Sequence, residues 1–123
     1  MPDSRHVVLA CGGRTYANEE RIFAVLDELH ARKPITLLVH GAARGADTLA
    51  GSWADMRGVA CKACPANWMV FGRQAGSTRN GAMLIEHKPD LVVAFPGGPG
   101  TADMVVQARW NKVLVLEVKN APC

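Results

Sequence analysis

Three glycine-rich segments, each placed directly after a short apolar run, have the residue types and spacing of phosphate-binding loops. They are Gly12-Gly13-Arg14 after residues 6–11, Gly41-Ala42-Ala43-Arg44-Gly45-Ala46-Asp47 after residues 35–40, and Pro96-Gly97-Gly98-Pro99-Gly100-Thr101 after residues 91–95. Glycine lets the backbone turn sharply and approach a ligand closely. Where a helix follows, its first N–H groups have no partner inside the helix and attract an anion. The segments therefore predict phosphate binding, with tight turns alone as the alternative.

Charged and amide side chains near these segments are candidates for ligand contact. Arg14 and Arg44 lie just beyond expected strand ends, where they could bind phosphate bidentately or lie solvated at the surface. Asp47 is expected in the first turn of a helix, where it could accept hydrogen bonds from ribose hydroxyls or only stabilise the helix start. Arg79 and Asn80 open another expected helix at the same edge, which favours ligand contact.

The roles of five further residues stay open between function and structure. Trp68 could stack on a base or cover the core. His40 ends an expected strand and could act as a base, although a hydrogen-bonded structural role is favoured. Thr101 is expected to cap the last helix and to touch phosphate. Trp53 and Trp110 fit helix faces that belong to the core or to a subunit interface.

Apolar runs and helical patterns alternate along the chain and would position these residues. Strands are expected near residues 6–11, 35–40, 59–64, 91–95 and 113–118, and helices near 18–32, 44–56, 78–87 and 101–110. Asn18 is a plausible N-cap, Gly58 closes the second helix, and residues 66–78 are irregular. This order indicates an α/β fold with about five parallel strands flanked by helices. The loops at the carboxyl ends of such strands gather at one edge of the sheet.

Composition indicates one ordinary domain, residues 1–123. The chain has 49% hydrophobic and 20% charged residues, and its formal net charge of +3 does not by itself imply nucleic acid. No apolar stretch approaches the ~20 residues of a membrane span, and the N-terminus lacks the apolar core of a signal peptide. We therefore expect a cytoplasmic protein without a membrane partner.

The four cysteines do not form a recognisable metal motif. Cys61 and Cys64 make a Cys-x-x-Cys pair, but no second pair or nearby histidine completes a zinc set. Their spacing places them on opposite faces of an expected strand. We expect these thiols, with Cys11 and Cys123, to be buried and free, and we expect neither a metal nor a cofactor.

The combined motifs resemble the SLOG superfamily, and within it the YspA-like, YpsA-related branch. The motifs are residues 12–16 and 40–47, Ala66-Asn67-Trp68, Ala75-Gly76-x-x-Arg79-Asn80-x-x-Met83-Leu84, and residues 96–101. The resemblance spans nearly the whole chain and implies a Rossmann-like three-layer sandwich. It also implies binding of nucleotides or nucleotide-derived ligands, and assembly into a homo-oligomer.

The last motif also resembles that of the Lonely Guy phosphoribohydrolases, Pro-Gly-Gly-x-Gly-Thr-x-x-Glu. Those enzymes cleave the N-glycosidic bond of nucleoside monophosphates with this Glu and an upstream Arg, whose counterpart here would be Arg79. Met104 occupies the Glu position, and a thioether cannot transfer a proton. Asp103 is adjacent but rotated by ~100° on a helix, so Asp47 is the preferred substitute carboxylate, and hydrolysis by Asp47 and Arg79 stays an alternative.

A second, weaker resemblance is to the single-stranded DNA-binding protein DprA (Smf), through Ala43-Arg44-Gly45-Ala46-Asp47. Single-strand binding uses a basic groove with several stacking aromatic rings. This chain has 6% aromatic residues and modest charge, so nucleic acid ranks below a small ligand. The favoured prediction is a protein that senses or sequesters a nucleotide-derived molecule, with an N-glycosidic hydrolase and a single-strand binder as alternatives.

Overall fold

The computed structural model describes residues 5–119 and contains one five-stranded sheet in which all neighbouring strands are parallel. The strands are β1 (Val7–Cys11), β2 (Leu37–His40), β3 (Cys61–Ala63), β4 (Leu91–Ala94) and β5 (Leu114–Glu117). Their order across the sheet is β3-β2-β1-β4-β5. From β1 the chain continues to β2 and then to β3 at one edge of the sheet. It then crosses back to β4, which lies on the other side of β1, and ends with β5 at the opposite edge. This arrangement confirms the predicted Rossmann-like α/β fold.

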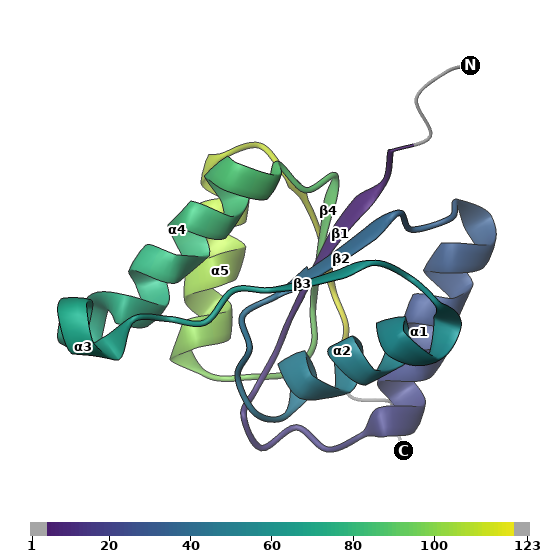
Figure 1. The fold of residues 1–123 in the computed structure, drawn as a ribbon, viewed down its shortest axis with the longest axis horizontal. Coiled ribbons are helices and arrows are strands. Elements are labelled where there is room, and N and C mark those ends of the chain that lie inside the picture. The colour runs from purple at the N-terminus through teal and green to yellow at the C-terminus, as the bar shows by residue number, and fades with distance from the viewer. Residues whose placement is uncertain (1–4, 120–123) are drawn as a thin grey trace.

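Helices cover both faces of the sheet (Figure 1). They are α1 (Glu19–Arg32), α2 (Ala46–Arg57), α3 (Trp68–Phe71), α4 (Ala75–His87) and α5 (Pro99–Trp110), with a 3-10 turn at Gly72–Gln74. In Figure 1, α1 and α2 lie to the right of the sheet and α4 and α5 to the left, with the short α3 at the outer end of α4. None of the helices in residues 5–119 is long and apolar enough to cross a membrane.

Local sequence accounts for where α1 and α2 begin and end. The Asn18 side chain accepts a hydrogen bond from the backbone N–H of Arg21 at 3.0 Å and so caps α1. Gly58 ends α2 in the left-handed conformation, with φ of 69°, which glycine adopts without steric cost. Both signals were read correctly from the sequence.

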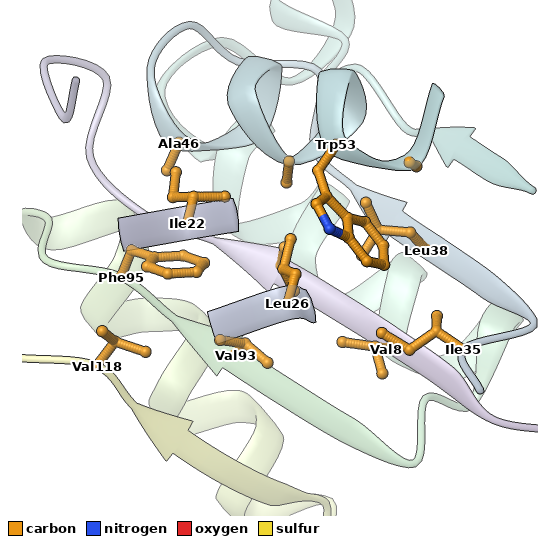
Figure 2. Packing of buried hydrophobic residues seen from close by; sticks show 13 residues of the cluster. Val8, Ile22, Leu26, Ile35, Leu38, Ala46, Trp53, Val93, Phe95 and Val118 are labelled. Carbon is orange, nitrogen blue, oxygen red and sulfur yellow. The ribbon is translucent and has the colours of Figure 1, made fainter. Parts of the chain in front are cut away.

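The core on one side of the sheet lies between the strands and helices α1 and α2 (Figure 2). Ile22 and Leu26 of α1 and Trp53 of α2 are completely buried there. The indole Nε1 of Trp53 donates a hydrogen bond to Asp27 Oδ1 at 2.7 Å, which satisfies its one polar atom. Trp53 is thus a core residue, which is one of the two placements, core or subunit interface, that the sequence predicts for it.

The core on the other side lies between the strands and helices α4 and α5. Leu9, Val39 and Val92 of the sheet pack there with Met83 of α4 and Met104 of α5. Met104 is 1% exposed. Its side chain is therefore part of the packing that holds α5 to the sheet.

Three helix starts differ from the sequence prediction. α2 begins at Ala46 rather than near Arg44, with Gly45 at the N-cap position. α4 begins at Ala75 rather than near Thr78, because the turn at 72–74 leads directly into it. α5 begins at Pro99, with Gly98 at the N-cap position, so Thr101 is its third residue and the predicted capping by Thr101 is wrong. Proline at the first position of a helix is favourable, because its missing N–H would have had no helical partner.

The predicted burial of the cysteines is only partly correct. Cys61 is exposed and Cys11 and Cys64 are half-buried, and these three thiols are free, while Cys123 lies outside the described residues. Cys61 is exposed because β3 forms an edge of the sheet. Leu114 of the opposite edge strand and Trp110 are also largely exposed, so Trp110 does not belong to the core.

Candidate functional site

A cleft of about 540 Å³ lies at the carboxyl ends of the strands. The chain leaves β1 toward one half of the sheet and β4 toward the other, so the loops after these neighbouring strands separate at this point. In open α/β sheets, such a divergence leaves a crevice in which ligands bind. The loop after β2 and the start of α4 complete its walls.

Most of the residues predicted to bind a ligand come together in this cleft. Those that line it are Gly12, Gly13, Arg14, Gly41, Asp47, Trp68, Arg79, Asn80, Gly98, Gly100 and Thr101. Those that do not are Ala42, Arg44, Gly45, Pro96 and Gly97. Pro96 and Gly97 lie beside a neighbouring shallow pocket with Tyr16 and Asn18.

The three glycine loops are bonded to one another behind the cleft. The N–H of Gly13 donates to the carbonyl of Pro96 at 2.9 Å, and the N–H of Ala46 donates to the carbonyl of Gly13 at 3.1 Å. A Cβ at Gly12 would lie 2.5 Å from that of Ala46, so the loops also need glycine for their close approach. Part of the glycine pattern is therefore explained by loop packing rather than by ligand contact.

The N-terminus of α5 opens onto the cleft. Its N-cap residue, Gly98, has no side chain to accept the first N–H groups, and Pro99 follows it. Gly98, Gly100 and Thr101 all line the cleft. Because the N-terminal end of a helix carries a partial positive charge and unpaired N–H groups, this wall of the cleft attracts an anion.

Asp47 lies deep in the cleft wall. Its Oδ2 accepts hydrogen bonds from the N–H groups of Gly41 at 3.0 Å and Ala43 at 3.2 Å, which shapes the loop after β2. Burial raises the pKa of its carboxyl group, while these bonds and the guanidinium groups of Arg79 and Arg14 act in the opposite direction. Asp47 thus organises the loop, and its contact with ribose stays a prediction.

Arg79 joins α4 to the loops after β2 and β3. Its Nη1 donates to the carbonyl of Gly41 in the loop after β2 and, at 3.3 Å, to the carbonyl of Cys64 after β3. Its Nε donates to Asn80 Oδ1 at 3.0 Å. Arg79 therefore holds α4 against the two loops and places positive charge next to Asp47.

A polar network connects α4 and α5 at the cleft, and its centre is Asp103. Asp103 accepts hydrogen bonds from Ser77 Oγ at 3.1 Å, from Asn80 Nδ2 at 2.9 Å and from Gln107 Nε2 at 2.8 Å. The expectation that Asp103 would be rotated away from the site is wrong. Asp103 lines the cleft, whereas Met104 points into the core, because α5 packs against the sheet through Met104, Val105 and Ala108.

One aromatic ring and two further arginines stand at the cleft. The guanidinium of Arg14 lies over the Trp68 ring, 5.6 Å from its centre. Trp68 is 50% exposed, so its ring is not a core residue. Arg73, which follows α3, also lines the cleft.

The thiol of Cys11 forms part of the cleft floor without being reactive. Burial, and then the nearby Asp47 carboxylate, raise the pKa of this thiol to about 12. It is therefore protonated at neutral pH. In residues 5–119, no group of three or more His, Cys, Asp or Glu side chains could hold a metal ion.

Six residues of the cleft were missed by sequence reasoning: Cys11, Arg73, Gly76, Ser77, Met83 and Asp103. Ala43 and Pro99 also line the cleft and belong to the predicted loops, although neither was named as a contact residue. A signal existed for the polar network, because Ser77 lies three residues before Asn80 and Asp103 four residues before Gln107. Such spacings place side chains on one helical face. For Arg73 there was none, since the segment before α4 has no regular pattern.

His40 lies behind the cleft rather than in it. Its Nδ1 accepts a hydrogen bond from the N–H of Ala42 at 3.0 Å, and a Cβ at Gly51 would lie 2.9 Å from its Nε2. Burial, and then the charge of Arg79, lower the pKa of the imidazole. This geometry matches the structural role that the sequence favoured.

We expect stability to fall as the pH is lowered below about 6.5, the unperturbed pKa of histidine. Because the folded-state pKa of His40 is lowered, the unfolded state binds more protons in this range, so acid favours unfolding until the lowered pKa is passed. Protonation at Nδ1 would also break the bond from Ala42, which costs about 1 kcal/mol.

The comparison is between wild type and His40→Asn, whose amide oxygen can replace Nδ1 as acceptor. Melting temperatures are measured from pH 7.5 to 5. The variant is expected to lose less stability than wild type over this range, and equal losses would contradict the assignment to His40.

Comparison with known proteins agrees with this architecture. The chain is 33% identical to the "Gene 61 protein" of Mycobacterium phage D29, over 94% of this chain and 98% of the phage protein. The structure of the molybdenum cofactor binding protein from the phototrophic bacterium Rippkaea orientalis superposes with a TM-score of 0.72. That match has 18% sequence identity and covers 95% of this chain and 78% of the other, so it concerns the fold alone.

The sequence profile of the YspA, cpYpsA-related SLOG family matches residues 6–71, which is more than half of the chain. The matched part includes the strands β1, β2 and β3 and the first two glycine loops. This chain belongs to the YspA, cpYpsA-related SLOG family.

Proposed function

We propose that this protein binds a nucleotide-derived small molecule in the cleft, as a sensor or a sequestering protein. The observation that carries the proposal is the meeting of an uncapped helix start, three arginines and one exposed tryptophan ring in a single cleft. Phosphate suits the helix start and the guanidinium groups, and a base suits the ring.

The two parts of such a ligand would lie at different walls. Its phosphate would bind at Gly98, Gly100 and Thr101, with Arg14 as a bidentate partner. Its base would stack on Trp68, where it would displace the guanidinium of Arg14 from over the ring and leave this group to bind the phosphate. The structurally similar protein that binds the molybdenum cofactor is a precedent for small-molecule binding on this fold. Assembly into a homo-oligomer also stays a proposal.

The test is a thermal-shift screen with AMP, ADP-ribose, NAD and cyclic dinucleotides, followed by mass spectrometry of each mixture. A ligand at ~100 times its dissociation constant adds roughly 2.7 kcal/mol of stability. A shift with intact ligand is expected, and no shift across the panel would contradict the proposal.

Arg14→Ala and Arg44→Ala form a matched pair for locating the site. Arg14 lines the cleft and Arg44 does not. Loss of one charged hydrogen-bonding partner costs about 1.5–3 kcal/mol, so Arg14→Ala is expected to weaken binding roughly 10- to 150-fold. Arg44→Ala is expected to bind like wild type. Equal effects of the two changes would mean that the ligand responds only to total charge.

A second candidate, hydrolysis of an N-glycosidic bond, is favoured by one observation. Asp47 combines a raised carboxyl pKa with a place in the cleft next to Arg79, and such perturbed groups are typical of acid–base catalysts. The same mass spectra would then show free base and ribose phosphate. Asp47→Asn would abolish their release, and release by this variant would remove Asp47 from the mechanism.

A further inference from the structure

The carboxylate of Asp103 is held in a fixed position at the cleft. Its Oδ2 accepts from Asn80 Nδ2 at 2.9 Å and from Gln107 Nε2 at 2.8 Å, and its Oδ1 accepts from Ser77 Oγ at 3.1 Å. These donors come from two helices, α4 and α5. Rotation of the carboxylate would therefore break bonds on both sides.

The donors of this network are themselves held in place. Asn80 is 4% exposed, and its amide also bonds to Arg79 Nε through Oδ1 and to the carbonyl of Gly100 through Nδ2. The Ser77 hydroxyl, besides donating to Asp103, accepts from Gln107. The donors to Asp103 are thus fixed by bonds to other groups of the protein.

Oδ1 of Asp103 keeps the capacity to accept another hydrogen bond. A carboxylate oxygen can accept two, and in residues 5–119 Ser77 is its one donor. Because Asp103 lines the cleft, this capacity is available to a ligand. The other carboxylate of the cleft, Asp47, is 5% exposed and its Oδ2 bonds to the backbone.

A carboxylate here is unfavourable for a ligand that carries only negative charge. Besides Asp103, the cleft presents Arg14, Arg73, Arg79 and the first N–H groups of α5, all of which attract anions. Asp103 would repel the same anions but accept a hydrogen bond from a hydroxyl group. Attraction of anions by the arginines and the helix start, together with hydrogen-bond acceptance by Asp103, selects a ligand that is anionic in one part and carries hydroxyl groups in another.

We propose that Asp103 recognises a sugar hydroxyl, so that the cleft selects phosphorylated ribose over equally charged ligands that lack the hydroxyls. This inference rests on the proposed function, since it assigns a part of the same ligand. It gives the protein a specificity-determining residue on α5, two residues after the third glycine loop, which would bind the phosphate.

The test measures a ratio of affinities. The probes are AMP and GMP, each paired with its 2′,3′-dideoxy counterpart, and affinities are measured by calorimetry. A hydrogen bond to a charged group makes wild type prefer the hydroxylated member about 10- to 100-fold. In Asp103→Asn, the amide oxygen can keep the bonds from Asn80 and Gln107, which places the NH₂ group where Oδ1 accepts. The preference is then expected to fall well below that of wild type, because a neutral amide that donates to the hydroxyl oxygen is a weaker partner than a carboxylate that accepts from the hydroxyl.

Gln107→Ala is the matched control. It removes one donor to Asp103 but leaves the carboxylate, and Gln107 does not line the cleft. This variant is expected to retain the preference for the hydroxylated probe, while its melting temperature reports the structural part of the network.

The outcomes separate the two proposals. If wild type binds none of the four probes, the nucleotide proposal fails for monophosphates and this inference fails with it. If wild type binds the members of each pair equally, the inference alone fails. It also fails if Asp103→Asn changes both affinities by the same factor, since the carboxylate would then act only through its charge or through α4–α5 packing.

Discussion

Replacement of Gly45 by alanine is expected to lower the free energy of unfolding by about 3 kcal/mol or more. Gly45 has φ of 74° and ψ of −124°, which side-chain-bearing residues rarely adopt. A Cβ at this position would lie 2.2 Å from the carbonyl oxygen of Gly13, a backbone atom that accepts the N–H of Ala46. The loops after β1 and β2 would have to separate. For a chain of this size the melting temperature should fall by roughly 10 °C.

Gly72→Ala is the matched control for the cost of the backbone conformation alone. Gly72 has φ of 56° and ψ of −129°, close to the angles of Gly45, but its missing Cβ would meet nothing within 4 Å. Such a conformation costs a residue with a side chain about 1–3 kcal/mol. The excess loss in Gly45→Ala therefore measures the contact between the loops, and thermal melts of the two variants that coincide would show that this contact is not tight.

Arg79→Ala is expected to reduce stability by about 2–3 kcal/mol and to abolish ligand binding. The change leaves the carbonyls of Gly41 and Cys64 without this donor and frees α4 from both loops. It also removes the cation that opposes the raised carboxyl pKa of Asp47. The ionised carboxylate of Asp47 then lowers the free energy of unfolding further at neutral pH, because its burial is no longer offset by this cation.

The pH dependence of this loss distinguishes charge from packing. A carboxyl group whose folded-state pKa is raised destabilises the protein when ionised, so acid relieves the cost as the pH falls through that pKa. The difference between wild type and Arg79→Ala should therefore shrink toward pH 4. Asp47→Asn in the Arg79→Ala background should restore part of the stability at pH 7, and a purely additive double variant would contradict the electrostatic coupling. Arg79→Lys keeps the charge and should bind weakly.

Much of the fold could be predicted because its signals are local. The apolar runs, the cap at Asn18 and the terminator Gly58 each act within a few residues, and the observed β1, α1 and α2 follow them closely. The alternation of strands and helices then leaves few topologies with parallel pairing. The starts of α4 and α5 were less well predicted, because the turn at 72–74 and the helical Pro99 have no unique local signature.

Several polar and charged residues of the cleft could also be predicted from the sequence. Arg14, Asp47, Arg79 and Asn80 do line one cleft, because all follow or face the carboxyl ends of parallel strands. Arg44 was equally plausible by this argument and lies outside. A loop residue next to a strand end can point either way, and only the path of the loop between Gly41 and Gly45 decides which.

The sequence by itself determined the α/β architecture, the edge of the sheet at which the candidate site lies and the glycine-rich loops that form part of it, since each depends on residues close in the chain. Only the tertiary structure decided that Asp103 rather than Met104 faces the cleft, that Arg73 joins it, and that one oxygen of Asp47 bonds to its own loop. Periodicity gives the spacing of side chains around a helix. The rotation of that helix about its axis is set by what it packs against, here the sheet and α4.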